Sequence, residues 1–330
     1  MSAAAPARTP GSSANTVMTL LLWGLAFATP VIFPGKALLL NEIAILALFV
    51  LSLDLILGIA GIVSLGHAAF LGIGAYAAGL LAKAGYGDPL LGLGFGMACA
   101  ALAGFATSFL VLRGSDLTRL MVTLGIAMLL YELANRLASL TGGADGLSGL
   151  EFRPLLGAFE FDLYGRTACL YSLSVLAAAF ALCRRLLRSP FGFSLRAIRD
   201  NRLRAEAIGI PAGARLVAIY TAAAALAGAA GALQAQTSQF VSLSLLDFHR
   251  SAEALLVLVI GGAGTLYGAL IGALVFRVAQ DALSRLSPQH WEFFVGLILV
   301  TLVLVGHERI RRAALSLGVW VRPRRNGAGL

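Results

Sequence analysis

Long apolar runs, interrupted by short polar segments, extend over most of the chain. Most of them are about 20 residues long and nearly free of charge, which suits a helix that crosses a bilayer. Backbone groups in lipid must be hydrogen-bonded within the chain, so each run is expected to be a helix or a broken helix. The pattern therefore predicts an all-α, polytopic membrane protein with about ten transmembrane or partly re-entrant helices. The predicted segments are residues 17–34, 38–60, 63–82, 89–112, 117–138, 167–187, 213–236, 251–266, 268–285 and 289–306.

An arginine-rich stretch, Cys183–Pro211, separates two of these runs and orients the others. It holds seven arginines against two acids, Asp200 and Glu206. Short basic loops stay on the cytoplasmic side of a membrane, so residues 189–211 are predicted to be cytosolic. Alternation of the segments then places residues 139–166 outside, as an extracytoplasmic loop, and the N-terminus inside.

The C-terminal end is consistent with this orientation only if Ser251–Leu286 crosses the membrane twice. The tail, residues 307–330, is basic and is predicted to be cytoplasmic. One long helix would put it outside, whereas two crossings put it inside. The expected break is at four glycines, Gly261, Gly262, Gly264 and Gly268. The transmembrane domain is thus predicted to span residues 17–306.

Composition supports a membrane protein and narrows the possible partners. Charged residues make up 12% of the chain, about half of the roughly 25% of a soluble domain. Residues 1–16 are rich in Ala, Ser and Pro and are expected to be a disordered cytoplasmic N-terminus. A cleaved signal peptide ending near Ala28 is the alternative. The basic tail suits cytoplasmic anchoring better than nucleic acid, so no nucleic-acid partner is predicted.

Small residues recur every four positions within several predicted helices. This spacing places them on one helix face and allows close approach of a neighbouring backbone, which predicts tight helix packing, with a moving interface as the alternative. The members are Gly92, Gly96, Ala100, Gly104 and Ser108; Ala224, Gly228 and Ala232; and Gly264, Gly268 and Gly272. Two short stretches, residues 58–61 and 261–264, also share a Gly-x-Ala-Gly pattern, which is too short to establish a repeat.

Sequence motifs for catalysis are absent. The chain has no G-x-x-x-x-G-K-[ST], no H-E-x-x-H and no G-x-S-x-G, and its histidines and cysteines lack ligand spacing. No enzyme activity, cofactor or metal site is therefore predicted. Few charges lie deep in the segments, namely Asp54, Glu132 and Arg277. Asp54 is expected to hydrogen-bond near Ser52 or Ser64, and Glu132 to pair with Arg136. A carrier driven by protons or sodium ions would need more charges deep in its segments. We therefore expect the energy for transport to come from outside this chain.

The cytosolic loop offers a place for such a source to act. Taken as one helix, Ser194–Gly209 has a charged arc opposite an apolar arc, and Gly209 and Pro211 end it. An amphipathic helix of this kind either lies on lipid headgroups or docks into a groove of a partner protein.

Three blocks of residues resemble the permease subunits of branched-chain amino acid ABC importers. Residues 199–201 followed by 205–210, RDN and AEAIGI, resemble the coupling ("EAA") loop of ABC importer permeases. Residues 64–76, SLGHAAFLGIGAY, and 261–268, GGAGTLYG, resemble two further signatures of that family. Their order and spacing are similar to the M-type subunits of the Liv permease family and cover about residues 38–306.

The resemblance implies a permease subunit that forms half of a translocation path in a bacterial inner membrane. Its partners would be an H-type second permease, two cytosolic ATP-binding subunits, an extracytoplasmic solute-binding protein and membrane lipid. It implies an ATPase-coupling role for Arg196, Arg199, Asp200, Glu206, Ala207 and Gly209. It implies a path lined from Ser64, Gly66, His67, Phe70 and Tyr76, although packing is the alternative for most of these.

Alternatives remain open for both the substrate and the energy source. Branched-chain amino acids are the commonest cargo of the family, but related permeases carry urea, short amides or aromatic acids. Asp54 stands where an amide is expected and Ile59 where an aromatic residue is common, so the exact solute stays open. The alternative function is a self-contained secondary carrier or facilitator. A membrane anchor without transport is disfavoured by the number of glycine-broken segments.

Overall fold

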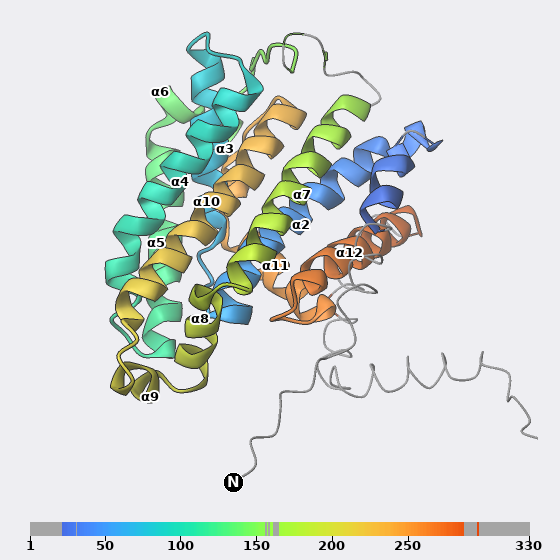
Figure 1. Cartoon of the computed structure of the whole chain (residues 1–330). Coiled ribbons are helices and arrows are strands. Elements are labelled where there is room, and N and C mark those ends of the chain that lie inside the picture. The colour runs from blue at the N-terminus through green and yellow to red at the C-terminus, as the bar shows by residue number, and fades with distance from the viewer. Residues whose placement is uncertain are drawn as a thin grey trace, which may run out of the picture.

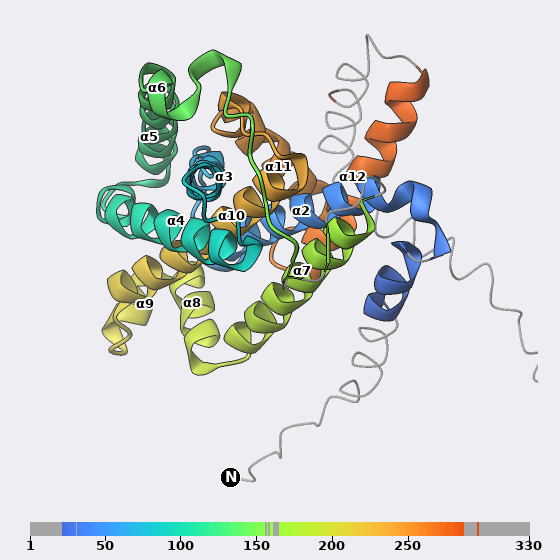
Figure 2. The same cartoon turned by 90° about the horizontal axis from the view of Figure 1, so that it is seen from above.

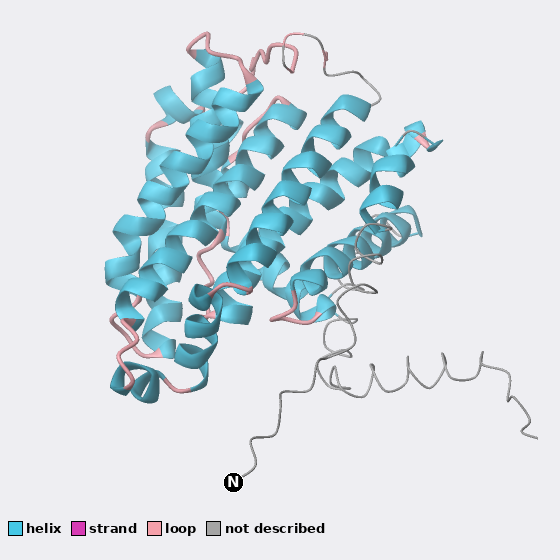
Figure 3. Cartoon of the chain, viewed as in Figure 1, coloured by secondary structure: helices cyan, strands magenta, loops and turns pink. Residues whose placement is uncertain are grey.

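The structure is a computed structural model that describes residues 22–30, 32–155, 157, 159–160, 165–286 and 296. Over these residues the protein is built of helices and holds no strand (Figures 1 and 3). Two isolated bridges are present, one of which joins Leu147 to Val241. The all-α prediction is therefore confirmed for the described part of the chain.

The helices follow one another along the chain with short connections. The α-helices are α2 (Ala37–Asp54), α3 (Ala68–Lys83), α4 (Pro89–Val111), α5 (Asp116–Arg136), α6 (Ala138–Thr141), α7 (Arg166–Leu187), α8 (Pro190–Asp200), α9 (Arg202–Ala207), α10 (Ala212–Ser238), α11 (Phe248–Gly261) and α12 (Leu266–Leu286). Three 3-10 turns are η1 (Pro34–Lys36), η3 (Gly143–Asp145) and η4 (Leu243–Leu245), and η2 (Leu55–Ile59) is a π-helical continuation of α2. Residues 22–30 are also helical.

Six helices in the described part are long and apolar enough to cross a membrane. They are α2 with η2, α4, α5, α7, α10 and α12. Two predicted segments are shorter: α3 has 16 residues because residues 61–67 are not helical, and α11 has 14. A count of about ten is not confirmed, and the segment 289–306 lies outside the described residues apart from Gly296, as do residues 1–16 and 307–330.

Helix α10 lies at the centre of the molecule, between α3 and α4 on one side and α2 on the other. Seen from above (Figure 2), α3, α4 and α5 gather on one side of α10, and α7 and α12 on the other side of α2. The packing is close because small residues meet. A side chain at Gly231 of α10 would overlap the backbone carbonyl of Leu71 in α3.

The small face predicted for α4 is confirmed. Its buried residues are Pro89, Gly92, Gly96, Ala100, Gly104, Ser108 and Val111. A side chain at Gly228 would run into Ala100, so α4 and α10 can approach only because both faces are small. Helix α4 starts at Pro89, and Asp88 caps it by accepting hydrogen bonds from Leu90 and Leu91 backbone N–H groups at 2.8 and 3.3 Å.

Candidate functional site: the two-helix loop and the glycine junction

The predicted coupling loop forms two helices, α8 and α9, instead of one. The expectation of a single helix over Ser194–Gly209 is wrong, because Asn201 adopts an extended conformation (φ −160°, ψ 103°). Its side-chain oxygen accepts a hydrogen bond from the Arg204 N–H at 2.9 Å and so starts α9. Asparagine is a favoured N-cap residue, and this local bond outweighs continuation of α8. Both helices project beyond one end of the bundle, below α10 in Figure 1.

Helix α8 keeps the amphipathic pattern that the sequence predicts. Leu195 and Ile198 are buried against the bundle, whereas Arg196 and Asp200 are exposed. Packing of one apolar stripe positions the helix and leaves its charged arc exposed. The remaining residues predicted for coupling lie on α9 or directly after it, and Glu206 and Ala207 are exposed there.

Glycine is required where α9 ends. Gly209 has φ of +87°, and the Ile210 N–H donates to the carbonyl of Ala205 at 3.0 Å. This six-residue closure is the helix-ending motif in which glycine avoids the penalty of a left-handed conformation. Glu206 forms an ion pair with Arg202 at 2.9 Å, within the same short helix. The turn thus fixes the end of the loop and presents Glu206 outward.

Arg199 links α8 to the interior of the bundle. Its Nη1 donates a hydrogen bond to the backbone carbonyl of Gly58 in the π-helical turn η2. Its aliphatic stem lies over Gly61, where a Cβ would be 3.0 Å from Arg199 Cγ. A π-helical turn leaves backbone carbonyls less regularly paired than an α-helix does, and such turns are frequent at functional sites. Arg199 is therefore the side chain through which α8 engages the end of α2.

The connection between α11 and α12 meets η2 at the same point. The Gly264 N–H donates to Asp54 Oδ1 at 2.6 Å, and Asp54 is fully buried. The expected partners of Asp54, Ser52 and Ser64, are therefore wrong; Gly264 takes their place. Asp54 lies on the buried face of α2 and faces a loop that is 210 residues away in sequence.

Glycines are needed at this meeting point for steric reasons. A side chain at Gly58 would overlap both the Asp54 carboxylate and the Gly264 backbone. Gly264 has φ of +85°, a region that favours glycine. We call the cluster of Asp54, Gly58, Gly61, Gly264 and Arg199 the glycine junction. It joins α8, the end of α2 and the turn between α11 and α12.

A buried aromatic cluster lies next to the junction. His67 is fully buried; its Nε2 lies 2.8 Å from Ser52 Oγ, and its ring stacks on Phe49 with centroids 5.5 Å apart. Phe70 meets His67 edge-on at 5.7 Å and Tyr220 of α10 at the same distance. The cluster holds the non-helical residues 61–67 against α2 and α10. This is a packing role for two residues that the resemblance assigns to the path.

The other residues expected in the path are also mostly buried. Ser64 is fully buried, and a side chain at Gly66 would overlap the carbonyl of Thr123 in α5. Tyr76 faces a cavity of about 350 Å³ between α3, α4 and α5, lined also by Phe95. In the described part of the chain these five residues do not share one open cavity.

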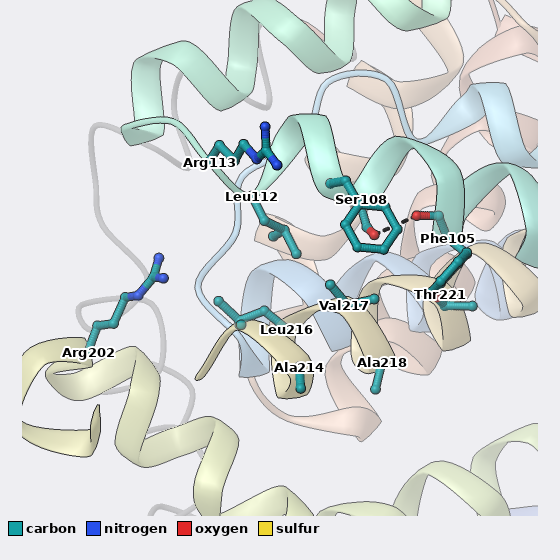
Figure 4. A pocket seen from close by; sticks show the side chains of 12 residues that line it. Phe105, Ser108, Leu112, Arg113, Arg202, Ala214, Leu216, Val217, Ala218 and Thr221 are labelled. Atoms are coloured by element: carbon teal, nitrogen blue, oxygen red, sulfur yellow. Dashed lines mark hydrogen bonds between the residues drawn. The ribbon is translucent and has the colours of Figure 1, made fainter. Parts of the chain in front are cut away.

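A larger cavity lies between α4 and α10, beside α9. Its volume is about 860 Å³, and its walls are mainly apolar. Figure 4 shows Arg113 and Arg202 at one end of it and Ser108 on the α4 wall, where Ser108 Oγ donates to the Phe105 carbonyl at 2.6 Å. The cavity lies outside the predicted path residues.

Sequence reasoning missed the meeting of Gly58 with Gly264. The signal was present, because both belong to the Gly-x-Ala-Gly stretches at residues 58–61 and 261–264. The match is too short to identify contact by itself. The predicted pair of Glu132 and Arg136 is confirmed, with Nε and Oε1 2.8 Å apart. No group of three potential metal ligands occurs among the described residues.

The architecture defined by these features is that of a helical membrane protein with a two-helix loop, α8 and α9, at one end of the bundle. The chain belongs to the family described as the permease component of branched-chain amino acid transport systems, whose model matches residues 37–305. The matched part includes α2 to α12, the two-helix loop and the glycine junction.

Individual relatives agree with this assignment. The chain is 28% identical over 280 residues to the high-affinity branched-chain amino acid transport system permease protein LivM of Escherichia coli, over 77% of this chain and 64% of that protein. It is 26% identical to the L-arabinose ABC transporter permease protein AraH of Azospirillum brasilense, over 91% and 87%. It is 30% identical to the autoinducer 2 import system permease protein LsrC of an Enterobacter species, over 73% and 70%. No solved structure matches the chain.

Proposed function

We propose that the chain is a membrane-embedded permease subunit of an ABC importer and forms half of a path for leucine, isoleucine and valine. The family and the similarity to LivM support transport as the function and branched-chain amino acids as the substrate. The named cargoes of AraH and LsrC differ, so the family alone does not select the solute. The complete transmembrane domain has about ten helices, of which α3 and α11 are re-entrant or broken, as their short lengths suggest.

The coupling residues act where α8 and α9 meet the ATPase subunits. Arg196, Asp200, Glu206 and Ala207 supply the exposed contact surface, and Gly209 supplies the turn back to α10. Arg199 transmits displacement of α8 to the glycine junction. The observation that carries this proposal is the hydrogen bond from Arg199 to the Gly58 carbonyl, since it ties the exposed loop to the end of a spanning helix.

One subunit supplies only half of the path, so this proposal requires partner proteins. A second, H-type permease would complete the path, two cytosolic ATP-binding subunits would dock on the loops, and an extracytoplasmic solute-binding protein would deliver the solute. Both chain termini and the α8–α9 loop lie in the cytoplasm in this proposal, with residues 139–166 outside the inner membrane. The excess of arginine in residues 183–211 supports this orientation.

The path in this proposal passes near residues 64–76, with Ser64, Gly66, His67, Phe70 and Tyr76 as its candidate residues. Because the structure buries most of them in one subunit, they would line the path only when the helices move. Selection would be delegated mainly to the binding protein, and the permease would hold the solute weakly.

The decisive experiment replaces Arg199 in the complete importer. Arg199→Ala removes the bond to Gly58 while leaving the buried apolar stripe of α8 intact. We expect assembly with the ATPase subunits but at least a tenfold loss of leucine uptake, because a hydrogen bond to a charged group contributes about 1.5–3 kcal/mol. Uptake and ATP hydrolysis are measured together in proteoliposomes.

The matched control is Arg136→Ala, an exposed arginine paired with Glu132 on α5. It is expected to leave uptake unchanged. Normal uptake by Arg199→Ala would show that α8 is only a surface helix lying on lipid, and uptake without any ATPase subunit would favour the self-contained carrier.

A further inference from the structure

A further cavity, with charged side chains in its lining, lies away from the glycine junction. It has a volume of about 220 Å³ and is bounded by α2, α3, α10, η4, α11 and α12. Four charged side chains reach it: Glu42, Arg250, Glu253 and Arg277. We call it the charged cavity. Charges within membrane-spanning helices are costly, so Glu42 of α2 and Arg277 of α12, which share this cavity with two charges of α11, point to a functional site.

The two positive groups are only partly engaged. Arg250 Nη1 lies 2.9 Å from Glu253 Oε2, which is a close ion pair. Arg277 Nη1 is 3.7 Å from Glu42 Oε2, beyond a normal hydrogen bond, and donates instead to Gln280 Oε1 at 2.7 Å. Arg277 Nε is buried and has no hydrogen-bond partner among the described residues. The Arg277 guanidinium at this cavity therefore has an N–H donor without a hydrogen-bond partner among the described residues.

The remaining wall is apolar. Ile45, Leu46 and Phe49 of α2 line it together with Leu71 and Leu245. A small solute that fills this space would meet opposite charges on one side and hydrocarbon on the other. An aliphatic amino acid has this distribution of groups, with a carboxylate and an ammonium at one end and a branched alkyl group at the other.

We infer that the charged cavity is a transit site that recognises the zwitterionic backbone of an aliphatic amino acid, an inference that rests on the proposed function. Arg277 binds the α-carboxylate, since a guanidinium offers parallel donors to a carboxylate. Glu42 and Glu253 accept from the α-ammonium. Neutral solutes such as a pentose, urea or an amide carry no pair of opposite charges and leave these groups unmatched, which disfavours their entry.

The cavity is connected to the glycine junction by continuous helices. Glu42 and Asp54 both lie on α2, twelve residues or about 18 Å apart. Arg277 lies on α12, which begins directly after the Gly264 turn, and Glu253 lies on α11, which leads into that turn. Displacement at the junction would therefore change the spacing between the charges on α2 and those on α11 and α12, and release a bound amino acid.

The test uses cysteine protection in the complete importer, reconstituted in proteoliposomes. Gln234 of α10 lines the charged cavity and is partly exposed. The thiol of Gln234→Cys is modified with a small methanethiosulfonate, which forms a mixed disulfide and releases methanesulfinate; the parent protein gives the background from the native cysteines. We expect L-leucine to slow this modification, and L-leucinamide, 4-methylpentanoate and L-arabinose to have no effect at the same concentration.

Arg277→Gln in this background should raise the leucine concentration for half-protection about tenfold, which corresponds to loss of about 1.4 kcal/mol. Arg277→Lys should restore part of the effect. Arg285→Gln on the same helix, an exposed arginine paired with Asp281, is the control and should change nothing. If the importer with Arg277→Gln does not assemble, the same test is made with Glu253→Gln and with the compounds leucinamide, 4-methylpentanoate and arabinose.

The possible failures are distinguishable. If the parent importer takes up leucine but leucine does not protect Gln234→Cys, or leucinamide protects it equally well, the cavity assignment is overturned and the proposed function stands. A parent importer that takes up arabinose but no amino acid overturns both.

Discussion

The crossing of α3, α4 and α10 and the glycine junction both depend on glycine, but for different reasons. At the crossing, small residues repeat along helix faces, and regular backbones pack against one another. At the junction, the glycines lie in a π-helical turn and in a loop with positive φ, and polar bonds from Asp54 and Arg199 hold them together. The first arrangement packs regular helices face to face, whereas the second joins α8, η2 and the α11–α12 turn through a few polar bonds.

Because of this difference, we expect the crossing to affect the stability of the protein and the junction to affect transport. Packing between spanning helices is the main source of cohesion where lipid competes for apolar surface, so the crossing determines whether the protein folds. The junction contributes few contacts to that cohesion, yet it is where helix α8 reaches η2 and the α11–α12 turn. Substitutions in the two regions are therefore expected to affect different measurements.

The largest effect is expected at the crossing. Gly231→Leu places a side chain on the backbone carbonyl of Leu71, which cannot move without shifting α3. Overpacking costs about 1–3 kcal/mol where side chains can adjust, and a clash with backbone exceeds that range. We expect no monodisperse protein after detergent extraction, measured by size-exclusion chromatography.

The control for this prediction is on the same helix. Gly213→Leu adds the same side chain at a position with nothing within 4 Å, so it should yield normal protein. Equal yields from the two variants would contradict a packing role for the crossing.

A smaller effect on stability, but a large one on transport, is expected at Gly58. Gly58→Ala pushes a methyl group into the Asp54 carboxylate and the Gly264 backbone, so the α11–α12 turn must separate from η2. We expect assembled importer whose ATP hydrolysis no longer depends on solute-loaded binding protein. Gly94→Ala on α4, with open space around it, is the matched control and should remain coupled.

The mildest effect is expected at Asp54. The Asp54 Oδ1 atom accepts from the Gly264 N–H, and an asparagine oxygen can accept the same bond. Asp54→Asn should therefore retain most transport, whereas Asp54→Ala, which leaves the buried N–H without its acceptor, should cost about 1–3 kcal/mol at the junction. Uptake rates of the two variants, normalised to the amount of assembled importer, give the comparison. Equal uptake by both would show that the Gly264 bond is dispensable.

Much of this protein follows from its sequence alone. Apolar length predicted helices at α2, α4, α5, α7, α10 and α12, since a spanning helix needs a long uncharged run. The spacing of small residues predicted the buried face of α4, and the Arg-rich amphipathic stretch predicted a surface helix between α7 and α10. These features depend on local periodicity and composition, which one sequence displays directly.

Tertiary structure decided the rest, because it depends on which distant segments meet. The break of the loop at Asn201 results from a side-chain bond that competes with helix continuation, and local propensity does not settle that competition. Residues 61–67 are mostly apolar yet non-helical; the Leu65 N–H donates to Thr123 of α5, and His67 stacks on Phe49 of α2. The partner of Asp54 is 210 residues away, and no spacing along the chain reveals a contact that only the packing of α2 against the α11–α12 turn creates.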